Sequence, residues 1–371
     1  MKFSCNQQVL NKALTIVSKA VTPRTTIPLQ KGILMETMED GYLKLTASDT
    51  DMTIEKNIQI DMMEHGSLVV SSRLFSDIIR KLPSDQVEIE EDDNKGLIIR
   101  CSSSEFTIIG QPPDDFTVLP PIEEKEEILL NKELFKEMIR KTAFSASIDE
   151  SKGILTGVLI EIAENSLTFV ALDGFRMSVV TETTGNMGSK NIIVSARIMT
   201  EIYKILSDME EDENITLIIE DKKAVIKMED TIIALRLMDG IFLKYKDIIP
   251  IDHQSFVKVR REELLHSIER ASLMAKEGKN NLIKLDIFRD KIIITSRSEE
   301  GNVREELFVE KEGNDLEIGF NAKYMTDVLK VIQDEEIMLK FNTSVTPCLI
   351  TPVEGNDFNY LVLPVRIGVN Q

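Results

Sequence analysis

Three aspartates are the residues whose type and spacing could carry out chemistry. Asp49 and Asp51 lie two positions apart, and Asp173 follows Asp49 by 124 residues, so their carboxylates could bind a metal ion or transfer a proton. Asp49 and Asp173 hold equivalent places in an internal repeat, however, and one active site does not need the same residue in two domains. Aspartate also caps the turn at the end of a strand. We therefore interpret these aspartates as turn residues, with a metal-dependent hydrolase as the alternative.

The chain contains no other motif that predicts catalysis. His65, His253 and His266 show neither the HExxH spacing nor a paired metal ligand, and no GxSxG sequence is present. Residues 185–190 resemble a phosphate-binding loop but lack the Gly-Lys-Ser/Thr ending of that motif. The sequence therefore predicts no catalytic residue, no metal site and no cofactor.

Cysteine usage and hydropathy indicate a cytoplasmic protein. The cysteines are odd in number and have no CxxC spacing, which disfavours disulfides and zinc binding. We interpret all three as core residues: Cys5, Cys101 and Cys348. The N-terminus becomes polar before an apolar signal-peptide core could form, and no run of 18 apolar residues occurs. We expect no membrane partner.

A six-residue pattern occurs three times and predicts three copies of one domain. Residues 70–75, 194–199 and 320–325 share an apolar start and a basic residue at the same place, at offsets of 124 and 126 residues. Periods of this length are the size of whole domains. We expect the domains to span residues 1–124, 125–250 and 251–371.

Each copy is predicted to contain two helices packed on antiparallel sheet, an α+β arrangement with about eight short strands. The first helix should follow a short strand, at residues 3–5, 128–130 and 257–259. The second should start after a residue that can cap its N-terminus: Ser71, Ser195 and Asn321. Helical spacing predicts one buried face for the first helix of the chain, made of Val9, Leu10, Ala13, Leu14 and Val17. The apolar segment 360–366 is interpreted as an edge strand of the third sheet.

Helices and sheets are predicted to carry opposite charges. The net charge of −19 would repel a nucleic acid unless the basic residues gather in one place. The six predicted helices carry 17 basic and 8 acidic residues, whereas the rest of the chain carries 27 basic and 55 acidic residues. Arg73, Arg197 and Lys323 lie just past a helix start, where the helix dipole favours acids instead. If the helices share one side of the sheets, that side can bind a polyanion.

Several segments are similar, in order and spacing, to segments of one protein family. They are residues 1–3, 24–28, 71–83, 171–177 with the sequence Asp-Gly-Phe-Arg, 317–324 and 360–367. On these segments the chain resembles the bacterial replicative sliding clamp, the beta subunit of DNA polymerase III, over essentially its full length. The resemblance implies a head-to-tail homodimer closed into a ring, with helices lining the bore. It also implies a non-enzymatic processivity factor that encircles duplex DNA.

The resemblance also implies where DNA is contacted. The residues that match by position or by helix charge are Arg24, Arg73, Arg197, Lys12, Lys136, Arg140, Lys204, Lys323 and Lys330. Relatives place aromatic and polar DNA contacts where this chain has Asp149, Gly153 and Ile154, so no contact is carried over to these three positions.

A second implied site is an apolar pocket between the second and third copies. There the polymerase III catalytic subunit, the clamp loader, other polymerases and repair proteins would dock a short peptide. Its residues would be Leu155, Leu172, Gly174, Phe175, Arg176, Met177, Asn321, Tyr324, Val345, Pro347, Val362, Leu363, Pro364, Val365 and Arg366. Leu243 and Asp247 replace a proline and a basic residue that are common in relatives, so peptide preference should differ.

The subunit seam implied by the family joins Phe106 of one chain to Leu273 and Met274 of the other. Such a heterologous contact, made twice, closes a two-member ring. A protein-binding scaffold whose basic helices hold another polyanion or an acidic partner remains the alternative to the clamp. The scaffold would bind linear and circular DNA equally.

Overall fold

The computed structural model describes residues 1–22, 25, 27–119, 121–122, 127–185, 188–208 and 214–367. The chain divides into two compact units. Unit 1 comprises Met1–Leu134 and Lys204–Leu237, and unit 2 comprises Phe135–Tyr203 and the chain from Met238 onward. The second copy of the repeat is thus shared between the units.

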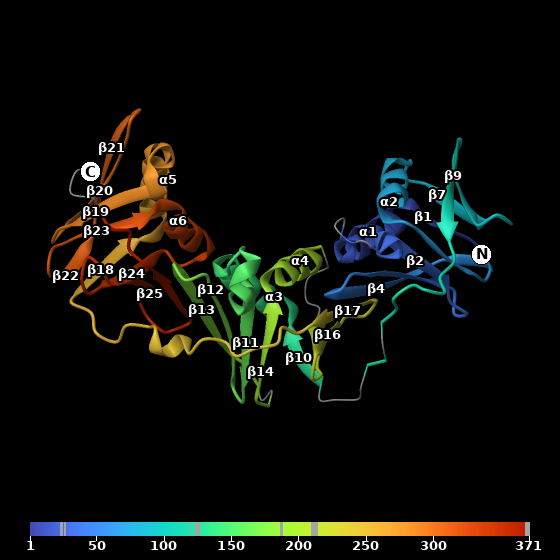
Figure 1. The fold of residues 1–371 in the computed structure, drawn as a ribbon, viewed down its shortest axis with the longest axis horizontal. Helices are drawn as coiled ribbons and strands as arrows, with labels where there is room; N and C mark the ends of the chain where they lie inside the picture. The colour runs from blue at the N-terminus through green and yellow to red at the C-terminus, as the bar shows by residue number, and fades with distance from the viewer. Residues whose placement is uncertain are drawn as a thin grey trace. The chain divides into compact units, whose positions relative to one another are not determined.

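The first copy has two helices that pack together on antiparallel sheet (Figure 1). The helices are α1 (Gln7–Val17) and α2 (Ser72–Lys81). Asn6 caps α1 because its side-chain oxygen accepts a hydrogen bond from the Gln8 N–H at 2.9 Å. The strands are β1 (Lys2–Asn6), β2 (Gly32–Thr37), β3 (Tyr42–Ser48), β4 (Met52–Gln59), β5 (Asp61–Glu64), β6 (Ser67–Ser71), β7 (Gln86–Glu91), β8 (Gly96–Cys101) and β9 (Ser104–Gln111).

The second copy repeats this order of elements. Its helices are α3 (Lys132–Thr142) and α4 (Ala196–Ser207), and a short 3₁₀ segment at Glu150–Thr156 precedes its first long strand. The strands are β10 (Glu127–Asn131), β11 (Gly157–Ala163), β12 (Ser166–Leu172), β13 (Arg176–Thr183), β14 (Lys190–Ser195), β15 (Asn214–Ile219), β16 (Lys223–Lys227) and β17 (Thr231–Arg236).

The third copy lies wholly in unit 2, where α5 and α6 pack side by side (Figure 1). The helices are α5 (Arg261–Glu277) and α6 (Ala322–Val331). The strands are β18 (Ser255–Arg260), β19 (Leu282–Ile287), β20 (Lys291–Ser298), β21 (Gly301–Phe308), β22 (Glu310–Gly313), β23 (Leu316–Asn321), β24 (Glu336–Phe341), β25 (Cys348–Pro352) and β26 (Phe358–Val362). Asn321 caps α6 as predicted, since its side chain accepts from the Lys323 N–H at 2.9 Å.

Strands of successive copies pair with each other at two junctions. The order β6-β2-β3-β4 of the first copy recurs as β14-β11-β12-β13 and as β23-β19-β20-β21. β4 pairs antiparallel with β17 of the second copy, and β13 pairs antiparallel with β26 of the third. Both junctions have the same register, because Ile54 lies opposite Ile233 in the first and the equivalent Ser178 lies opposite Tyr360 in the second.

This pairing corrects the prediction that the C-terminal apolar segment forms an edge strand. β26 lies inside a nine-stranded sheet, between β25 and β13. Tyr360 is fully buried there, and its hydroxyl donates to the Lys141 carbonyl at 3.1 Å. An alternating apolar pattern shows which side of a strand is buried but not which neighbours it has, so the sequence could not reveal this junction.

The predicted burial of α1 is correct except at one position. Leu10, Ala13, Leu14 and Val17 are fully buried, whereas Val9 is 43% exposed. Val9 lies beside Leu10 in sequence, and neighbouring positions on a helix point about 100° apart. None of the helices in the described part of the chain combines the length and apolar character that a membrane span needs.

Candidate functional sites

Two of the three aspartates considered for chemistry, Asp49 and Asp173, cap equivalent turns. Asp49 Oδ1 accepts hydrogen bonds from the backbone N–H groups of Asp51 and Met52, both at 2.8 Å. Asp173 Oδ1 accepts from Phe175 at 2.8 Å and Arg176 at 3.0 Å. This geometry supports the turn interpretation. Within the described ranges, no group of three or more His, Cys, Asp or Glu side chains could hold a metal ion.

Three predicted DNA contacts lie in unit 1. Lys12 on α1 and Arg73 at the second position of α2 are exposed, and so is Lys204 near the end of α4. The α1 and α2 helices contact each other, so Lys12 and Arg73 belong to one helical layer. Arg24, the fourth residue predicted here, lies outside the described residues.

Five predicted DNA contacts lie in unit 2, and three of them are exposed. Arg197 and Lys323 occupy the second positions of α4 and α6, and Lys330 lies near the end of α6. The Lys323 ammonium is 2.6 Å from Asp327 Oδ2, and that of Lys330 is 2.8 Å from Glu269. Ion pairs of exposed side chains contribute little stability, so both ammonium groups can turn to a phosphate at small cost.

Arg140 is held inside unit 2 more firmly than its sequence position suggested. Its guanidinium donates to both carboxylate oxygens of Glu137 at 2.7–3.0 Å and to the Val331 carbonyl at 3.0 Å. The hydrogen bond to Glu137 raises the pKa of Arg140, in spite of the opposing effect of burial. Arg140 therefore links the α3 helix to the end of α6, while Lys136 on the same helix is half-buried.

Three of the predicted pocket residues belong to one apolar cluster in unit 2. Leu172, Met177 and Leu361 are buried in this cluster, and Leu155 packs against it. The following segment is fixed by backbone hydrogen bonds, in which the Leu363 N–H donates to Phe175 O and the Val365 N–H to Gly319 O, each at 2.8 Å. The segment from Val362 to Arg366 thus lies beside both the Asp-Gly-Phe-Arg turn and β23.

Two aromatic rings lie in the region of the predicted pocket. Phe175 is 54% exposed and stacks on Tyr324, with ring centroids 6.2 Å apart. Gly174 adopts φ +93° in the turn before Phe175, a conformation that L side chains rarely adopt. Val345 is 69% exposed in the loop before β25, where Pro347 also lies.

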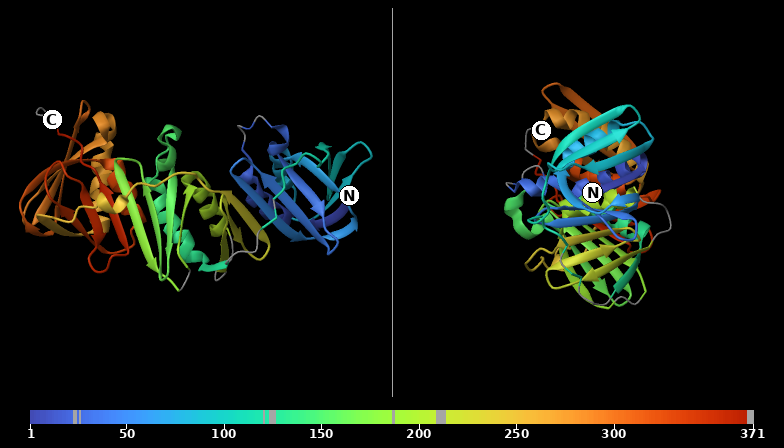
Figure 2. Two further views of the ribbon diagram at one scale, coloured as in Figure 1. Left: turned by 60° about the horizontal axis from the view of Figure 1, so that its bottom comes forward. Right: turned by 90° about the vertical axis from the view of Figure 1, so that its right-hand side faces the viewer.

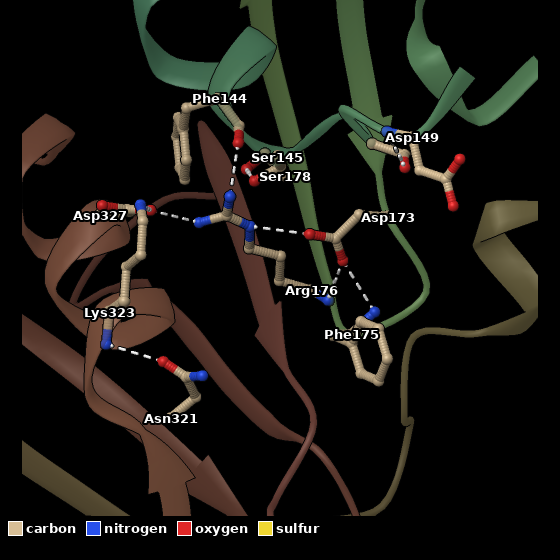
Figure 3. Close-up of polar contacts among 11 residues, drawn as sticks. Phe144, Ser145, Asp149, Asp173, Phe175, Arg176, Ser178, Asn321, Lys323 and Asp327 are labelled. Atoms are coloured by element: carbon tan, nitrogen blue, oxygen red, sulfur yellow. Dashed lines mark hydrogen bonds and ion pairs between the residues drawn. The ribbon is translucent and has the colours of Figure 1, made fainter. Parts of the chain in front are cut away.

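Arg176 is the polar centre of this region (Figure 3). Its guanidinium donates to Asp173 at 3.1 Å, to Asp327 at 2.6 Å and to the Phe144 carbonyl at 2.7 Å. The same group lies over the rings of Tyr324, at 4.8 Å, and Phe144, at 5.3 Å. Because Arg176 is 9% exposed and its charge is balanced on two sides, it forms a fixed part of this region.

The sequence did not predict a hollow of about 520 Å³ beside the same cluster. It is lined by Leu159, Glu161, Asn191, Ile193 and the linker residues 240–247, which include Leu243 and Asp247. The linker, residues 238–254, crosses the strands of unit 2 (Figure 2) and is tied to them by the Met238 N–H, which donates to Ile193 O. The Tyr245 hydroxyl donates to Glu161 at 2.5 Å, and burial, followed by this bond, raises the pKa of Tyr245. The hollow could have been inferred from one feature of the sequence, the apolar run Ile241-Phe242-Leu243 in the linker.

The predicted seam residues are exposed in the single chain. Phe106 on β9 is 41% exposed, and Leu273 on α5 is 59% exposed, while Met274 is half-buried. Ile109 on β9 and Phe308 on β21 are 88% and 75% exposed, although neither was predicted. Apolar side chains this open on strand edges need a cover in an assembled protein.

Three copies of one α+β unit, exposed cations at repeated helix starts and an exposed aromatic ring beside an apolar cluster are the features expected of a DNA clamp. Sequence models of the DNA polymerase III beta subunit match the chain in order: the N-terminal domain at residues 1–120, the central domain at 129–244 and the C-terminal domain at 246–366. The beta sliding clamp of Bacillus subtilis is 35% identical over 99% of this chain and 100% of its own length. That of Staphylococcus aureus is 33% identical, with 99% of each chain covered.

Solved structures agree with these matches. The crystal structure of a DNA polymerase III beta subunit from Eubacterium rectale superposes with a TM-score of 0.94 and 36% identity, covering 99% of this chain and 100% of the other. The Bacillus subtilis sliding clamp gives a TM-score of 0.94 at 34% identity, with the same coverage. The chain therefore belongs to the DNA polymerase III beta subunit family, the bacterial beta sliding clamps. Its function is that of a DNA sliding clamp and processivity factor.

Proposed function

We propose that two copies of this chain close head to tail into a ring that encircles duplex DNA and performs no bond chemistry itself. The ring keeps the polymerase III catalytic subunit near the primer end by raising its effective concentration. A clamp loader opens and closes the ring, and other polymerases and repair proteins share the docking pocket. The cytoplasm is the expected location.

The repeated strand junction is the observation that carries this proposal. β4 and β13, the last strands of equivalent half-sheets, each pair with a strand of the next copy. The third equivalent, β21, forms the edge of a four-stranded sheet in the described part of the chain. The first copy offers the matching strand, β9, which pairs with β8 along its length and with β6 at Gly110 and Gln111. The exposed apolar residues that precede these two, Phe106 and Ile109, need a cover. A second chain supplies each missing partner.

The internal repeat also gives the register of the seam. One position recurs in the hairpins that contain β4, β13 and β21. It is held by Ile54, which lies opposite Ala47, by Ser178, opposite Ala171, and by Val303, opposite Ser296. A second position recurs in the hairpins that contain β17, β26 and β9. It is held by Ile233, which lies opposite Ile226, by Tyr360, opposite Ile350, and by Phe106, opposite Ile99. Since Ile54 pairs with Ile233 and Ser178 with Tyr360, Val303 of one chain should lie opposite Phe106 of the other.

A disulfide test checks this register. Opposite residues of antiparallel strands have Cα atoms about 4.5–5.5 Å apart, which a disulfide can bridge. The variant Phe106→Cys/Val303→Cys should form covalent dimers under mild oxidation. The control Phe106→Cys/Phe308→Cys should not, because Phe308 lies five residues, or about 17 Å, further along the strand. The native cysteines are buried and do not interfere. Equal cross-linking of both variants would contradict the proposed seam.

Phosphate contacts would come from the basic residues of the helices. The proposed set is Lys12, Arg24, Arg73, Lys136, Arg140, Arg197, Lys204, Lys323 and Lys330. Contacts to phosphates alone fix position without reading sequence, which suits a clamp that slides. Within this set, Arg140 contributes chiefly by holding the helix layer together.

The aromatic wall and the cluster beneath it form the proposed peptide pocket. An exposed ring pair on a fixed arginine offers the kind of central apolar anchor site on which interface energy concentrates. Asp247 makes this pocket less basic than that of relatives with a basic residue at the same position, while Leu243 replaces a proline without changing the charge. We therefore expect weaker selection for acidic peptides.

Topological retention tests the function as a whole. The protein is loaded onto nicked circular DNA by a clamp loader with ATP, washed in high salt, and measured before and after the circle is cut. Retention that disappears on cutting supports an encircling ring. With loading verified independently, loss in salt from both forms would favour the scaffold alternative, since electrostatic binding weakens steeply with salt.

A further inference from the structure

We propose that Asp327 is a positioning residue that couples DNA contact on α6 to the peptide pocket. The inference rests on the proposed function, because it concerns the pocket around Arg176 and the phosphate contact of Lys323. It adds a link between the two sites. Peptide affinity should rise when the clamp is on DNA.

One carboxylate oxygen serves both sites. Asp327 Oδ2 accepts from Arg176 Nη1 at 2.6 Å and from Lys323 Nζ at 2.6 Å (Figure 3). The two cations come from different copies of the repeat, since Arg176 begins β13 and Lys323 lies on α6. Asp327 is 24% exposed, so its carboxylate is shielded from bulk water more than most surface acids.

The pocket side of this link is rigid and the DNA side is open. Arg176 has a 9% exposed side chain and lies under the Tyr324 ring that stacks on Phe175. Lys323 has a 64% exposed side chain and only one carboxylate partner in the structure as described. A phosphate can therefore draw Lys323 away, whereas Arg176 stays in place.

The direction of the coupling follows because Arg176 and Lys323 share one oxygen of Asp327. The two cations repel each other across the shared oxygen, so each is bound to Asp327 less strongly than it would be alone. When Lys323 moves to a phosphate, Asp327 is left to Arg176 alone, which fixes Arg176 and the ring wall more firmly. A better ordered pocket binds a peptide at a smaller entropic cost. By linkage, the peptide must raise the affinity for DNA by the same factor.

The experiment measures peptide affinity by fluorescence anisotropy, with and without a saturating short DNA duplex at low salt. The probe is a labelled short peptide of the polymerase III catalytic subunit, chosen for binding to the wild-type protein. We expect DNA to raise peptide affinity about fivefold in the wild type. In Lys323→Ala, the DNA-free affinity should already be raised and DNA should add nothing.

Two further variants separate positioning from folding. Asp327→Asn should weaken peptide binding about tenfold and abolish the DNA effect, and Asp327→Glu should restore part of both. The matched control is Lys258→Ala, which removes a lysine of the same copy that lies outside the proposed DNA contacts and pairs with Glu336 instead. It should keep the fivefold response.

Three outcomes decide the proposal. An unchanged DNA response in Lys323→Ala would overturn it, and so would loss of the response in Lys258→Ala, because the effect would then reflect positive charge in general. Absence of any peptide binding by the wild-type protein would overturn the proposed docking function and this inference together. Retention on circular DNA would still test the ring separately.

Discussion

Truncating the apolar residues of α5 should separate the two subunits. In the proposed ring, Leu273 and Met274 are covered by β9 of the other chain. The double variant Leu273→Ala/Met274→Ala removes this apolar surface from both seams while leaving the backbone of the helix unchanged. We expect monomers at concentrations where the wild-type protein is a dimer.

The size of the effect follows from exposure in the single chain. Burying a whole Leu or Met side chain contributes about 1.5–3 kcal/mol. Leu273 is 59% exposed, so its share is roughly 0.9–1.8 kcal/mol at each seam. Met274 is half-buried, and its contribution at each seam is about half that of Leu273. Because the ring has two seams, the total is about 3–5 kcal/mol, or on the order of a 10³-fold rise in the dimer dissociation constant.

Analytical ultracentrifugation over a range of concentrations measures that constant. The matched control is Leu129→Ala, since Leu129 is a similarly exposed leucine, at 66%, on the strand β10. This control should leave the dimer intact. A dissociation constant of the double variant within a few-fold of the wild-type value would refute the reasoning about the seam.

Three other perturbations test separate parts of the structure. Burial raises the pKa of Cys5 to about 12, so at pH 8 only about one in 10⁴ of its thiols is ionised. A thiol reagent should therefore label Cys5 only after denaturation, and rapid labelling of the native protein would contradict this. Asn6→Ala removes the cap of α1 and should lower the free energy of unfolding by about 1 kcal/mol in urea titrations, whereas a change below the error of the titration would show that the cap is not limiting. Arg73→Ala removes one proposed phosphate contact from each chain of the dimer. The slope of the logarithm of the DNA-binding constant against the logarithm of the salt concentration should become less negative by about 2. An unchanged slope would show that Arg73 does not contact DNA.

The repeat made much of the fold predictable from the sequence. The three strand-to-helix starts, with caps at Ser71 and Asn321, follow from local chemistry that the chain repeats. Local patterns also predicted that Asp49 and Asp173 cap turns, because an Asx turn involves only the two or three residues that follow. Such features depend on near neighbours alone and can be inferred wherever the residues recur.

Features that depend on distant partners were not predictable in the same way. Arg140 matched a DNA contact by charge and helix position, yet its guanidinium is engaged by Glu137 and by a carbonyl 191 residues away. The neighbours of β26 and the hollow under the linker depend on which strands and segments meet in three dimensions. No periodicity within a segment carries that information.

The two observed junctions between copies join unlike strands, β4 with β17 and β13 with β26, and the proposed seam joins β21 with β9 in the same sense. An assembly built only from unlike edges has a direction around its circumference, and its two faces therefore differ. Both docking pockets of the proposed ring must lie on the same face. Once such a ring is closed on DNA, it cannot be turned over without being opened, so the loading step decides which way every later partner will point along the duplex.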